Sequence, residues 1–336
     1  MSTAISSLGE RALIARLHAR LDAPPAHVRT GIGDDAAVLM PDRGMQTVLT
    51  TDSLVEQVHF RRDWTTASSI GHKALAVNLS DIAAMGATPR ASLLSLLLPA
   101  DLSLDDFDAL IDGYAALSRA SATPLIGGNI SRSPGPLVLD VTVLGSVRPR
   151  RLLLRSGARD GDELFVTGAL GAAAAGLVLL GEGHDRVGLA ADEVSCIEHQ
   201  ERPTPRLHVG RLVARTSAAS AAMDLSDGIA DAAATIASAS GVGVVIEAAA
   251  LPYHPGVADV AARQGRSISD FVLSGGEDYE LAFAVPVRRR SRFLLAARRA
   301  GQIRVTRIGR FETAPGAWIQ DADGRRAPLP AGFGHF

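Results

Sequence analysis

Four short acidic segments combine the residue types that bind divalent cations and phosphate. They are Gly31-Ile32-Gly33-Asp34-Asp35, Thr50-Thr51-Asp52-Ser53, Asn78-Leu79-Ser80-Asp81 and Met223-Asp224-Leu225-Ser226-Asp227-Gly228. Carboxylates that converge from several elements repel one another unless cations neutralise them. Hard oxygen ligands of this kind suit Mg²⁺, which usually bridges a few protein carboxylates to substrate phosphates. The segments therefore predict a magnesium-dependent nucleotide site.

For any single Asp, the simpler interpretation is a turn former or a helix cap. The set favours a site, because its members recur at the ends of expected elements: Asp34, Asp35, Asp52, Asp81, Asp224 and Asp227. The segment from Asp224 to Gly228 is also expected at a strand-to-helix junction, where backbone N–H groups favour phosphate.

Two glycine pairs are further candidates. Gly127-Gly128-Asn129 follows an apolar run and is expected at a strand end, where backbone can approach a ligand closely. Gly275-Gly276 precedes Glu277 in a cluster of carboxylates. A tight turn is the alternative for each pair. The segment 167–171 lacks the Gly-Lys-Ser/Thr ending of a Walker A loop.

Basic and nucleophilic residues give weaker signals. Arg155 is either a phosphate ligand or a solvated linker arginine, and His59 is either a packed residue or part of the site. No Ser/His/Asp nucleophile arrangement is legible. The lone cysteine, Cys196, excludes an internal disulfide and suits a reducing cytoplasm.

Apolar periodicity supplies the elements that must hold these residues. Helices are expected over 8–21, 67–85, 104–120, 171–180 and 229–239, and strands over 91–98, 137–147, 163–166, 242–247 and 281–285. Strands at 36–40 and 47–51 are expected to form a hairpin around a 41–44 turn. That hairpin would bring Asp34, Asp35 and Asp52 to one edge.

Composition predicts a cytoplasmic α/β protein of two domains, 1–150 and 151–336. The chain has 336 residues, and irregular sequence near 148–161 indicates the boundary. A net charge of −2 gives no basic field for nucleic acid. No apolar run is long enough to span a membrane, and the first ten residues do not have the pattern of a signal peptide.

Longer motifs carry a resemblance to a known family. They are Gly-Ile-Gly-Asp-Asp (31–35), Thr-Thr-Asp-Ser-Leu-Val-Glu-Gln-Val-His-Phe (50–60), Lys-Ala-Leu-Ala-Val-Asn-Leu-Ser-Asp-Ile-Ala-Ala-Met-Gly-Ala (73–87), Asp-Leu-Ser-Asp-Gly (224–228), Leu-Ser-Gly-Gly-Glu-Asp-Tyr-Glu-Leu (273–281) and Gly-Phe-Gly-His-Phe (332–336). Over nearly its whole length the chain resembles the thiamine-monophosphate kinases. These belong to the ATP-binding superfamily that includes aminoimidazole ribonucleotide synthetase and selenophosphate synthetase.

The resemblance implies direct transfer of the ATP γ-phosphoryl group to thiamine monophosphate, with several Mg²⁺ ions. It implies two mixed α/β domains of the aminoimidazole ribonucleotide synthetase type, with N-terminal domains that pair in a homodimer and close a β-barrel. The implied magnesium ligands are Asp35, Thr50, Thr51, Asp52, Asp81, Asn129, Asp224 and Asp227, with Asp52 and Asp227 catalytic. The implied ATP contacts are Gly127, Gly128, Arg155 and Ser226, and the implied substrate contacts are His59, Glu277 and Phe333.

One position departs from the family pattern. The family usually has Gly-Gly-Asp where this chain has Gly127-Gly128-Asn129. Asparagine keeps a carbonyl oxygen but lacks the negative charge, so one magnesium is expected to bind more weakly unless Ser131 compensates. Two alternatives stay open: a superfamily enzyme with another acceptor, and a non-catalytic nucleotide-binding regulator. Selenophosphate synthesis is disfavoured, because the N-terminal segment has no cysteine.

Overall fold

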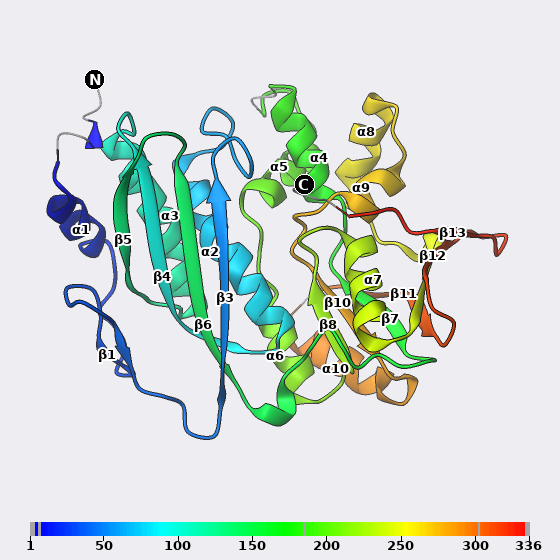
Figure 1. The fold of residues 1–336 in the computed structure, drawn as a ribbon. Helices are drawn as coiled ribbons and strands as arrows, with labels where there is room; N and C mark the ends of the chain where they lie inside the picture. The colour runs from blue at the N-terminus through cyan, green and yellow to red at the C-terminus, as the bar shows by residue number, and fades with distance from the viewer. Residues whose placement is uncertain (1–3, 6–7, 184–185, 302, 333–336) are drawn as a thin grey trace. The chain divides into compact units, whose positions relative to one another are not determined.

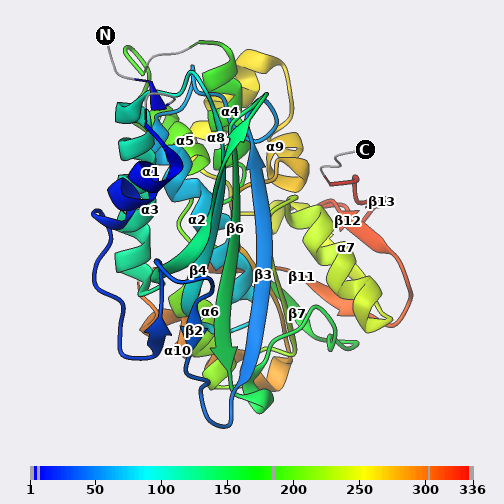
Figure 2. The same cartoon turned by 60° about the vertical axis from the view of Figure 1, so that its left-hand side comes forward.

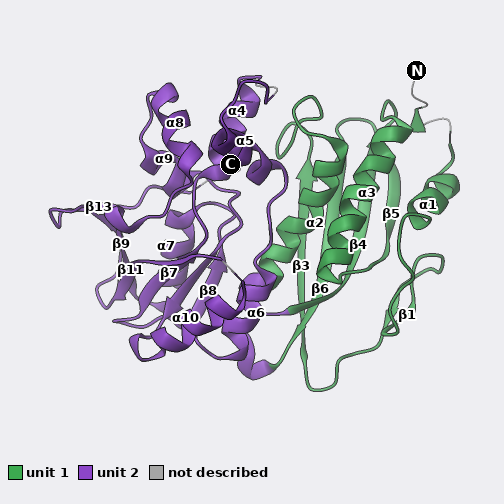
Figure 3. Cartoon of the chain, turned by 180° about the vertical axis from the view of Figure 1, so that it is seen from behind, with its two compact units in different colours: residues 1–82, 88–148 green, residues 83–87, 149–336 purple. Residues whose placement is uncertain are grey.

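The computed structural model describes residues 4–5, 8–183, 186–301 and 303–332. The chain divides into two compact units (Figures 1 and 3). Unit 1 contains residues 1–82 and 88–148, and unit 2 contains residues 83–87 and 149–336.

Unit 1 is built on a four-stranded sheet in the order β3-β6-β4-β5. Its strands are β3 (Gln46–Val55), β4 (Thr88–Pro99), β5 (Leu125–Ser133) and β6 (Val138–Val147). β6 pairs antiparallel with β3 and β4, and β4 pairs parallel with β5. The connection between the two parallel strands contains a helix, as parallel pairing requires.

Two long helices, α2 (Ala67–Ala84) and α3 (Leu104–Ser121), cover one face of this sheet (Figures 1 and 2). They approach closely at Gly71 and Gly113. A Cβ atom on Gly71 would lie 1.9 Å from the Leu110 carbonyl oxygen, and one on Gly113 would lie 1.9 Å from that of Ser68. Only glycine fits at these two positions, so the sequence fixes how closely the helices pack.

The N-terminal part of unit 1 holds α1 (Glu10–His18), β1 (Val28–Thr30) and β2 (Val38–Leu39). β2 pairs with β1, whereas β3 pairs with β6. The predicted hairpin between 36–40 and 47–51 is therefore wrong. β3 also continues to Val55, so Asp52 lies inside a strand and not at its end. Long-range pairing with β6 outweighed the local turn signal at 41–44.

Unit 2 contains a seven-stranded sheet in the order β13-β12-β9-β11-β7-β10-β8. Its strands are β7 (Glu163–Thr167), β8 (Ala221–Asp224), β9 (Gly243–Glu247), β10 (Leu281–Val285), β11 (Val305–Glu312), β12 (Ala317–Gln320) and β13 (Arg326–Pro328). Its helices are α4 (Ala172–Gly181), α5 (Ala191–Glu201), α6 (Leu207–Arg215), α7 (Ile229–Ser240), α8 (Pro255–Gln264), α9 (Ile268–Ser274) and α10 (Arg290–Arg299). Short 3₁₀ turns occur at Pro149–Arg151, Ala248–Ala250 and Val287–Arg289.

Strand alternation gives this sheet two buried faces. Leu164 and Val166 of β7 pack in a core with α7, whereas Phe165 between them packs in a second core with α6 and α10. Because successive strand residues point to opposite faces, one apolar strand supplies both cores. The predicted helices and strands outside the hairpin are all confirmed within a few residues.

Residues 191–200 belong to α5, which packs against α4 and α8. Of the helices that the structure describes, none is long and apolar enough to cross a membrane.

Candidate active site

In unit 1, Thr50 and Asp81 meet on the helix-covered face of the sheet. Thr50 Oγ1 on β3 donates a hydrogen bond to Asp81 Oδ2 near the end of α2. Asp52 lies two residues after Thr50 in the same strand and therefore shares its face. A hydroxyl and two carboxylates from two elements thus lie on one side of β3.

Thr51 points to the opposite face of β3. Its hydroxyl lies 3.1 Å from Thr142 Oγ1 and 3.4 Å from Asp140 Oδ1, both on β6. Ser53 also donates to Asp140, at 2.5 Å between Oγ and Oδ2. The predicted ligands Thr50 and Thr51 are therefore separated by the sheet. Sequence reasoning missed Asp140, although polar Asp140 and Thr142 alternate with apolar residues in β6 and signal a polar face.

That second face carries a cleft of about 760 Å³. It brings Asp35 and the adjacent loop together with Asn129 of β5 and Asp140 of β6, and α1 contributes part of its wall. Gly127 and Gly128 also line it. Asp35 and Asn129 are thus brought to one cleft, as is usual for a site with a few convergent polar groups.

The Gly127-Gly128-Asn129 segment lies inside β5, so its predicted position at a strand end is wrong. A Cβ atom on Gly128 would lie 1.8 Å from the Leu94 carbonyl oxygen of β4, and only glycine fits there. The Asn129 side chain donates from Nδ2 to Ser131 Oγ at 3.0 Å. Its carbonyl oxygen is not used in this bond and remains an oxygen ligand that a cation could take.

His59 lies in the turn after β3. The Val55 N–H donates to His59 Nδ1 at 3.1 Å. This bond fixes the orientation of the imidazole ring against the end of β3.

In unit 2, the Asp224–Gly228 segment joins β8 to α7, as predicted. Asp224 is the last residue of β8, and Gly228 is the N-cap of α7 with a φ of 97°. Ser226 Oγ donates to Asp227 Oδ2 at 3.1 Å. Two carboxylates and a hydroxyl therefore flank the start of a twelve-residue helix.

The Gly276–Glu280 segment lies along this junction. The Glu277 N–H donates to the Ser226 carbonyl at 2.7 Å, and the Tyr279 N–H donates to the Leu225 carbonyl at 3.1 Å. Glu277 and Tyr279 both have positive φ, of 58° and 47°, which is uncommon outside glycine. Such strained backbone clusters at functional sites. The structure thus brings Ser226 and Glu277 together.

Gln200 of α5 holds the Glu277 side chain. Its Nε2 donates to Glu277 Oε2 at 2.6 Å. The Gln200 side chain is 5% exposed, and its carbonyl oxygen has no hydrogen-bond partner in the described part of the chain. Sequence reasoning missed Gln200, because nothing in its charged surroundings marks a buried amide.

Asp231 and Gly332 lie near Asp227, and Arg155 acts on Asp231. The pKa of Asp231, in the first turn of α7, is raised above its usual value, mainly by burial and also by the charge of Asp227. The positive charge of Arg155 offsets part of this rise. Arg155 is therefore within electrostatic reach of these carboxylates. A Cβ atom on Gly332 would lie 2.9 Å from the Asp227 carbonyl, so the chain near its C-terminus packs here. The predicted substrate contact Phe333 lies outside the described residues.

Asp278 occupies the N-terminus of α4. Its two carboxylate oxygens accept from the Gly171 N–H at 2.7 Å and from the Ala173 N–H at 3.2 Å. The protein's own carboxylate thus takes the place that an anion would have after the 167–171 turn. Burial nevertheless raises the pKa of Asp278 to about 7.

The stability of the protein should depend on pH through Asp278. The pKa of Asp278 is about 7 in the folded protein and ~3.9 in an unfolded chain. Between pH ~3.9 and 7 the folded protein therefore binds more protons at this carboxyl than the unfolded chain does. The free energy of unfolding should therefore fall as pH rises through this window and should level off above pH ~7. Urea unfolding of wild type and Asp278→Asn from pH 4 to 8 checks this. The variant should lose part of the slope, and identical slopes would contradict the assignment.

Magnesium fits these donor sets. In the part of the chain that the structure describes, no three carboxylate, imidazole or thiol groups form a preformed metal cluster. Mg²⁺ does not need one, because it usually takes one or two carboxylates and completes its shell with water and phosphate oxygens. The Asp227–Asp231 repulsion also favours a cation at that place.

Comparisons with known proteins agree with this geometry. Residues 33–147 match the model of the AIR synthase related protein N-terminal domain, and residues 159–319 match that of the C-terminal domain. The chain is 37% identical to thiamine-monophosphate kinase of Escherichia coli K12 over 331 residues, which covers 98% of each protein. It is 42% identical to thiamine-monophosphate kinase of Synechococcus elongatus over 287 residues, 84% of this chain and 83% of the relative.

Solved structures give the same result. The crystal structure of thiamine-monophosphate kinase from Stenotrophomonas maltophilia superimposes with a TM-score of 0.83 at 40% identity and covers 95% of this chain and 98% of its own. The structure of AaThiL complexed with AMPPCP and TMP superimposes with a TM-score of 0.78 at 33% identity and covers 98% of both chains. The chain has the two-domain α/β fold of the AIR synthase related proteins and belongs to the thiamine-monophosphate kinase family.

Proposed function

We propose that this protein transfers the γ-phosphoryl group of ATP to thiamine monophosphate, giving thiamine diphosphate and ADP. The observation that carries the proposal is the backbone pairing of the Glu277 segment with the Ser226–Asp227 junction. This pairing places the expected substrate contact, Glu277, beside the expected ATP contact, Ser226, and the expected metal ligand, Asp227. Family membership at 37% identity over 98% of the chain supports the same activity.

The proposed roles follow the resemblance. Magnesium would be held by Asp35, Thr50, Thr51, Asp52, Asp81, Asn129, Asp224 and Asp227. ATP would contact Gly127, Gly128, Arg155 and Ser226, and thiamine monophosphate would contact His59, Glu277 and Phe333. On this proposal residues 1–150 bind ATP and magnesium and form the dimer, and residues 151–336 complete the nucleotide and substrate site.

The chemistry needs positioning more than proton transfer. The acceptor is a phosphate oxygen that is already anionic, so no strong general base is required. When bound, Mg²⁺ neutralises the phosphate charges as they approach one another. The chain itself contributes the Arg155 guanidinium as a donor to phosphate oxygens, and His59 would face the thiamine phosphate. Ser226 and the backbone at the start of α7 supply further donors.

We also propose a homodimer formed through unit 1. In the described sheet β3 has a neighbour only on its β6 side, which leaves a ten-residue edge. Leu49 of this strand is 64% exposed. Long unpaired edges are usually covered, and pairing with a second copy would close a barrel. Light scattering on a sizing column should give twice the 35.0 kDa chain mass, and a monomer at micromolar concentration would refute this.

We place the enzyme in the cytoplasm, because its only cysteine is a buried free thiol.

Gln200 should position Glu277 for the substrate. In Gln200→Leu the Glu277 carboxylate loses its buried donor, so we expect KM for thiamine monophosphate to rise roughly tenfold, with a smaller change in kcat. The matched control is Gln264→Leu, which removes an exposed glutamine that bonds to Glu182 in the same unit. Steady-state kinetics measure both. Equal KM values in the two variants would show that Gln200 has no positioning role.

The direct test incubates the purified protein with ATP, Mg²⁺ and thiamine monophosphate and measures thiamine diphosphate by chromatography. Absence of product across magnesium concentrations would reject the proposal. ATP binding without ATP consumption would favour a regulator instead. ATP consumption that depends on another acceptor would favour a different superfamily enzyme.

A further inference from the structure

A second cleft, of about 720 Å³, lies at the far end of three neighbouring strands of unit 2. Residues just before β7, just after β10 and just before β8 line it: 159–162, 286–289, and Ser217, Ala219 and Ser220. Asp224 and the Glu277–Glu280 segment lie at the opposite ends of β8 and β10. At ~3.3 Å per residue, strands of this length separate the two places by roughly 13–17 Å. The cleft is therefore distinct from the candidate active site.

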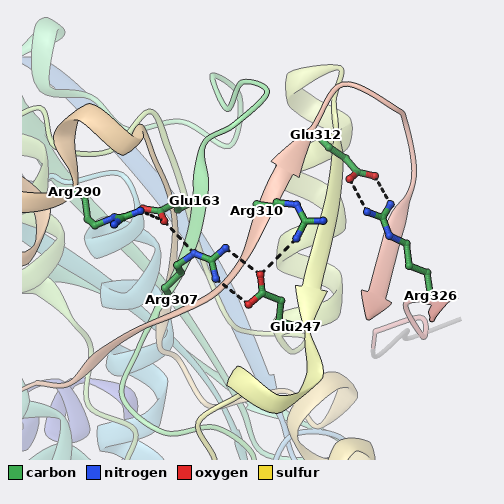
Figure 4. A network of polar contacts seen from close by, with 7 residues as sticks. All are labelled: Glu163, Glu247, Arg290, Arg307, Arg310, Glu312 and Arg326. Carbon is green, nitrogen blue, oxygen red and sulfur yellow. Dashed lines mark hydrogen bonds and ion pairs between the residues drawn. The ribbon is translucent and has the colours of Figure 1, made fainter. Parts of the chain in front are cut away.

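Five arginines line this cleft: Arg150, Arg151, Arg159, Arg288 and Arg289. None of them forms an ion pair with a residue that the structure describes. Their neighbours behave differently, because Arg290 and Arg307 both pair with Glu163 (Figure 4). Glu163 thus neutralises Arg290 and Arg307, whereas no described carboxylate forms an ion pair with the five arginines of the cleft.

The two carboxylates in the cleft are already engaged by other groups. Asp162 is 6% exposed, and its Oδ2 accepts from Ser220 Oγ at 2.6 Å and from the Arg159 N–H at 3.1 Å. Asp160 Oδ1 accepts from the Thr313 N–H at 2.9 Å. Both carboxylates therefore brace the backbone, and the cleft keeps an excess of positive charge.

An anion with several charges fits this arrangement. The guanidinium fork bonds phosphate oxygens in pairs, and like charges held together are stabilised by a counter-charge between them. The volume is in the range of small-molecule sites, ~300–1,000 Å³. We propose that this cleft binds a small anion that carries a diphosphate group. Inorganic diphosphate and the diphosphate end of a nucleotide share this chemistry. The inference does not depend on the proposed kinase activity.

Calorimetry with inorganic diphosphate, and separately with ADP, tests the site in the full chain without added Mg²⁺. The test variant is Arg159→Gln/Arg288→Gln. The matched control is Arg298→Gln/Arg299→Gln, which removes two exposed arginines of α10 outside the cleft. With inorganic diphosphate we expect one saturable site per chain. For either ligand, binding to the cleft should be at least tenfold weaker in the test variant and should change less than twofold in the control. Thiamine diphosphate formation should stay unchanged in both variants.

Comparing the two ligands shows whether the cleft recognises diphosphate itself or the diphosphate end of a nucleotide. Equal affinities show that the cleft recognises the diphosphate group alone. Tighter ADP binding that Arg159→Gln/Arg288→Gln weakens shows that the cleft prefers a nucleotide. Both results support the site. Absence of saturable binding, or equal weakening in test and control variants, would overturn it. Binding that survives Arg159→Gln/Arg288→Gln but disappears in Arg155→Gln would place the anion in the candidate active site and would also overturn the proposal.

Discussion

Replacing Asp227 by asparagine should lower kcat for thiamine diphosphate formation at least ~1,000-fold, which corresponds to about 4 kcal/mol of transition-state stabilisation. Asp227 sits before the N-cap of α7, with Ser226 bonded to it and Glu277 held against the preceding carbonyl. Its charge is therefore placed where phosphates and cations would meet. Asparagine has nearly the same shape, so the fold should be kept. Steady-state kinetics across magnesium concentrations measure the effect.

A matched control separates this from a general loss of charge. Asp259→Asn removes one exposed carboxylate from α8 of the same unit, and its kcat should equal that of wild type. A second readout does not depend on activity. Because the Asp227 charge helps to raise the pKa of Asp231, that pKa should fall in Asp227→Asn, as carboxyl NMR titration can show. Near-normal turnover in Asp227→Asn would refute the proposed role.

The parts of the site that are local in sequence could be predicted, and the parts made by long-range pairing could not. Asp224 ends β8 because the apolar run before it stops there. Gly228 is the N-cap of α7 because this position has a φ of 97°, which favours glycine. The pairing of β3 with β6, some ninety residues away, overrode the hairpin that the turn at 41–44 suggested. No local signal specifies such a partner.

Strand geometry also corrects how the predicted ligands are grouped. Thr50 and Thr51 are adjacent, and adjacent strand residues face opposite sides, so Thr50 meets Asp81 while Thr51 meets Asp140. Backbone hydrogen bonds join the Glu277 segment to Leu225 and Ser226, which lie about fifty residues earlier in the chain. The motifs identified these segments, but only the folded chain shows which members lie together.

The buried pair between Arg206 and Glu280 should be the most sensitive point for the stability of unit 2. Arg206 Nε donates to Glu280 Oε2 at 2.7 Å, a second contact joins Nη2 to Oε1, and Thr167 donates to the same carboxylate at 2.5 Å. The side chains are 17% and 3% exposed. Removing one partner leaves the other buried charge unpaired, so Arg206→Met should lower the free energy of unfolding by roughly 3–5 kcal/mol. Urea unfolding measures this value.

Two comparisons make this prediction specific. The double variant Arg206→Met/Glu280→Met should recover much of the loss, because an apolar pair can replace a buried ion pair at little cost. The matched surface pair is Arg326 with Glu312, also joined by two contacts, at 2.7 and 3.0 Å (Figure 4). Since exposed pairs contribute ~0–1 kcal/mol, Arg326→Met should change stability little. Additive losses in the double variant would contradict the coupling.

Because Glu280 adjoins the Glu277 segment and its carbonyl accepts the Leu225 N–H, Arg206→Met should also weaken substrate binding at temperatures where the variant is still folded.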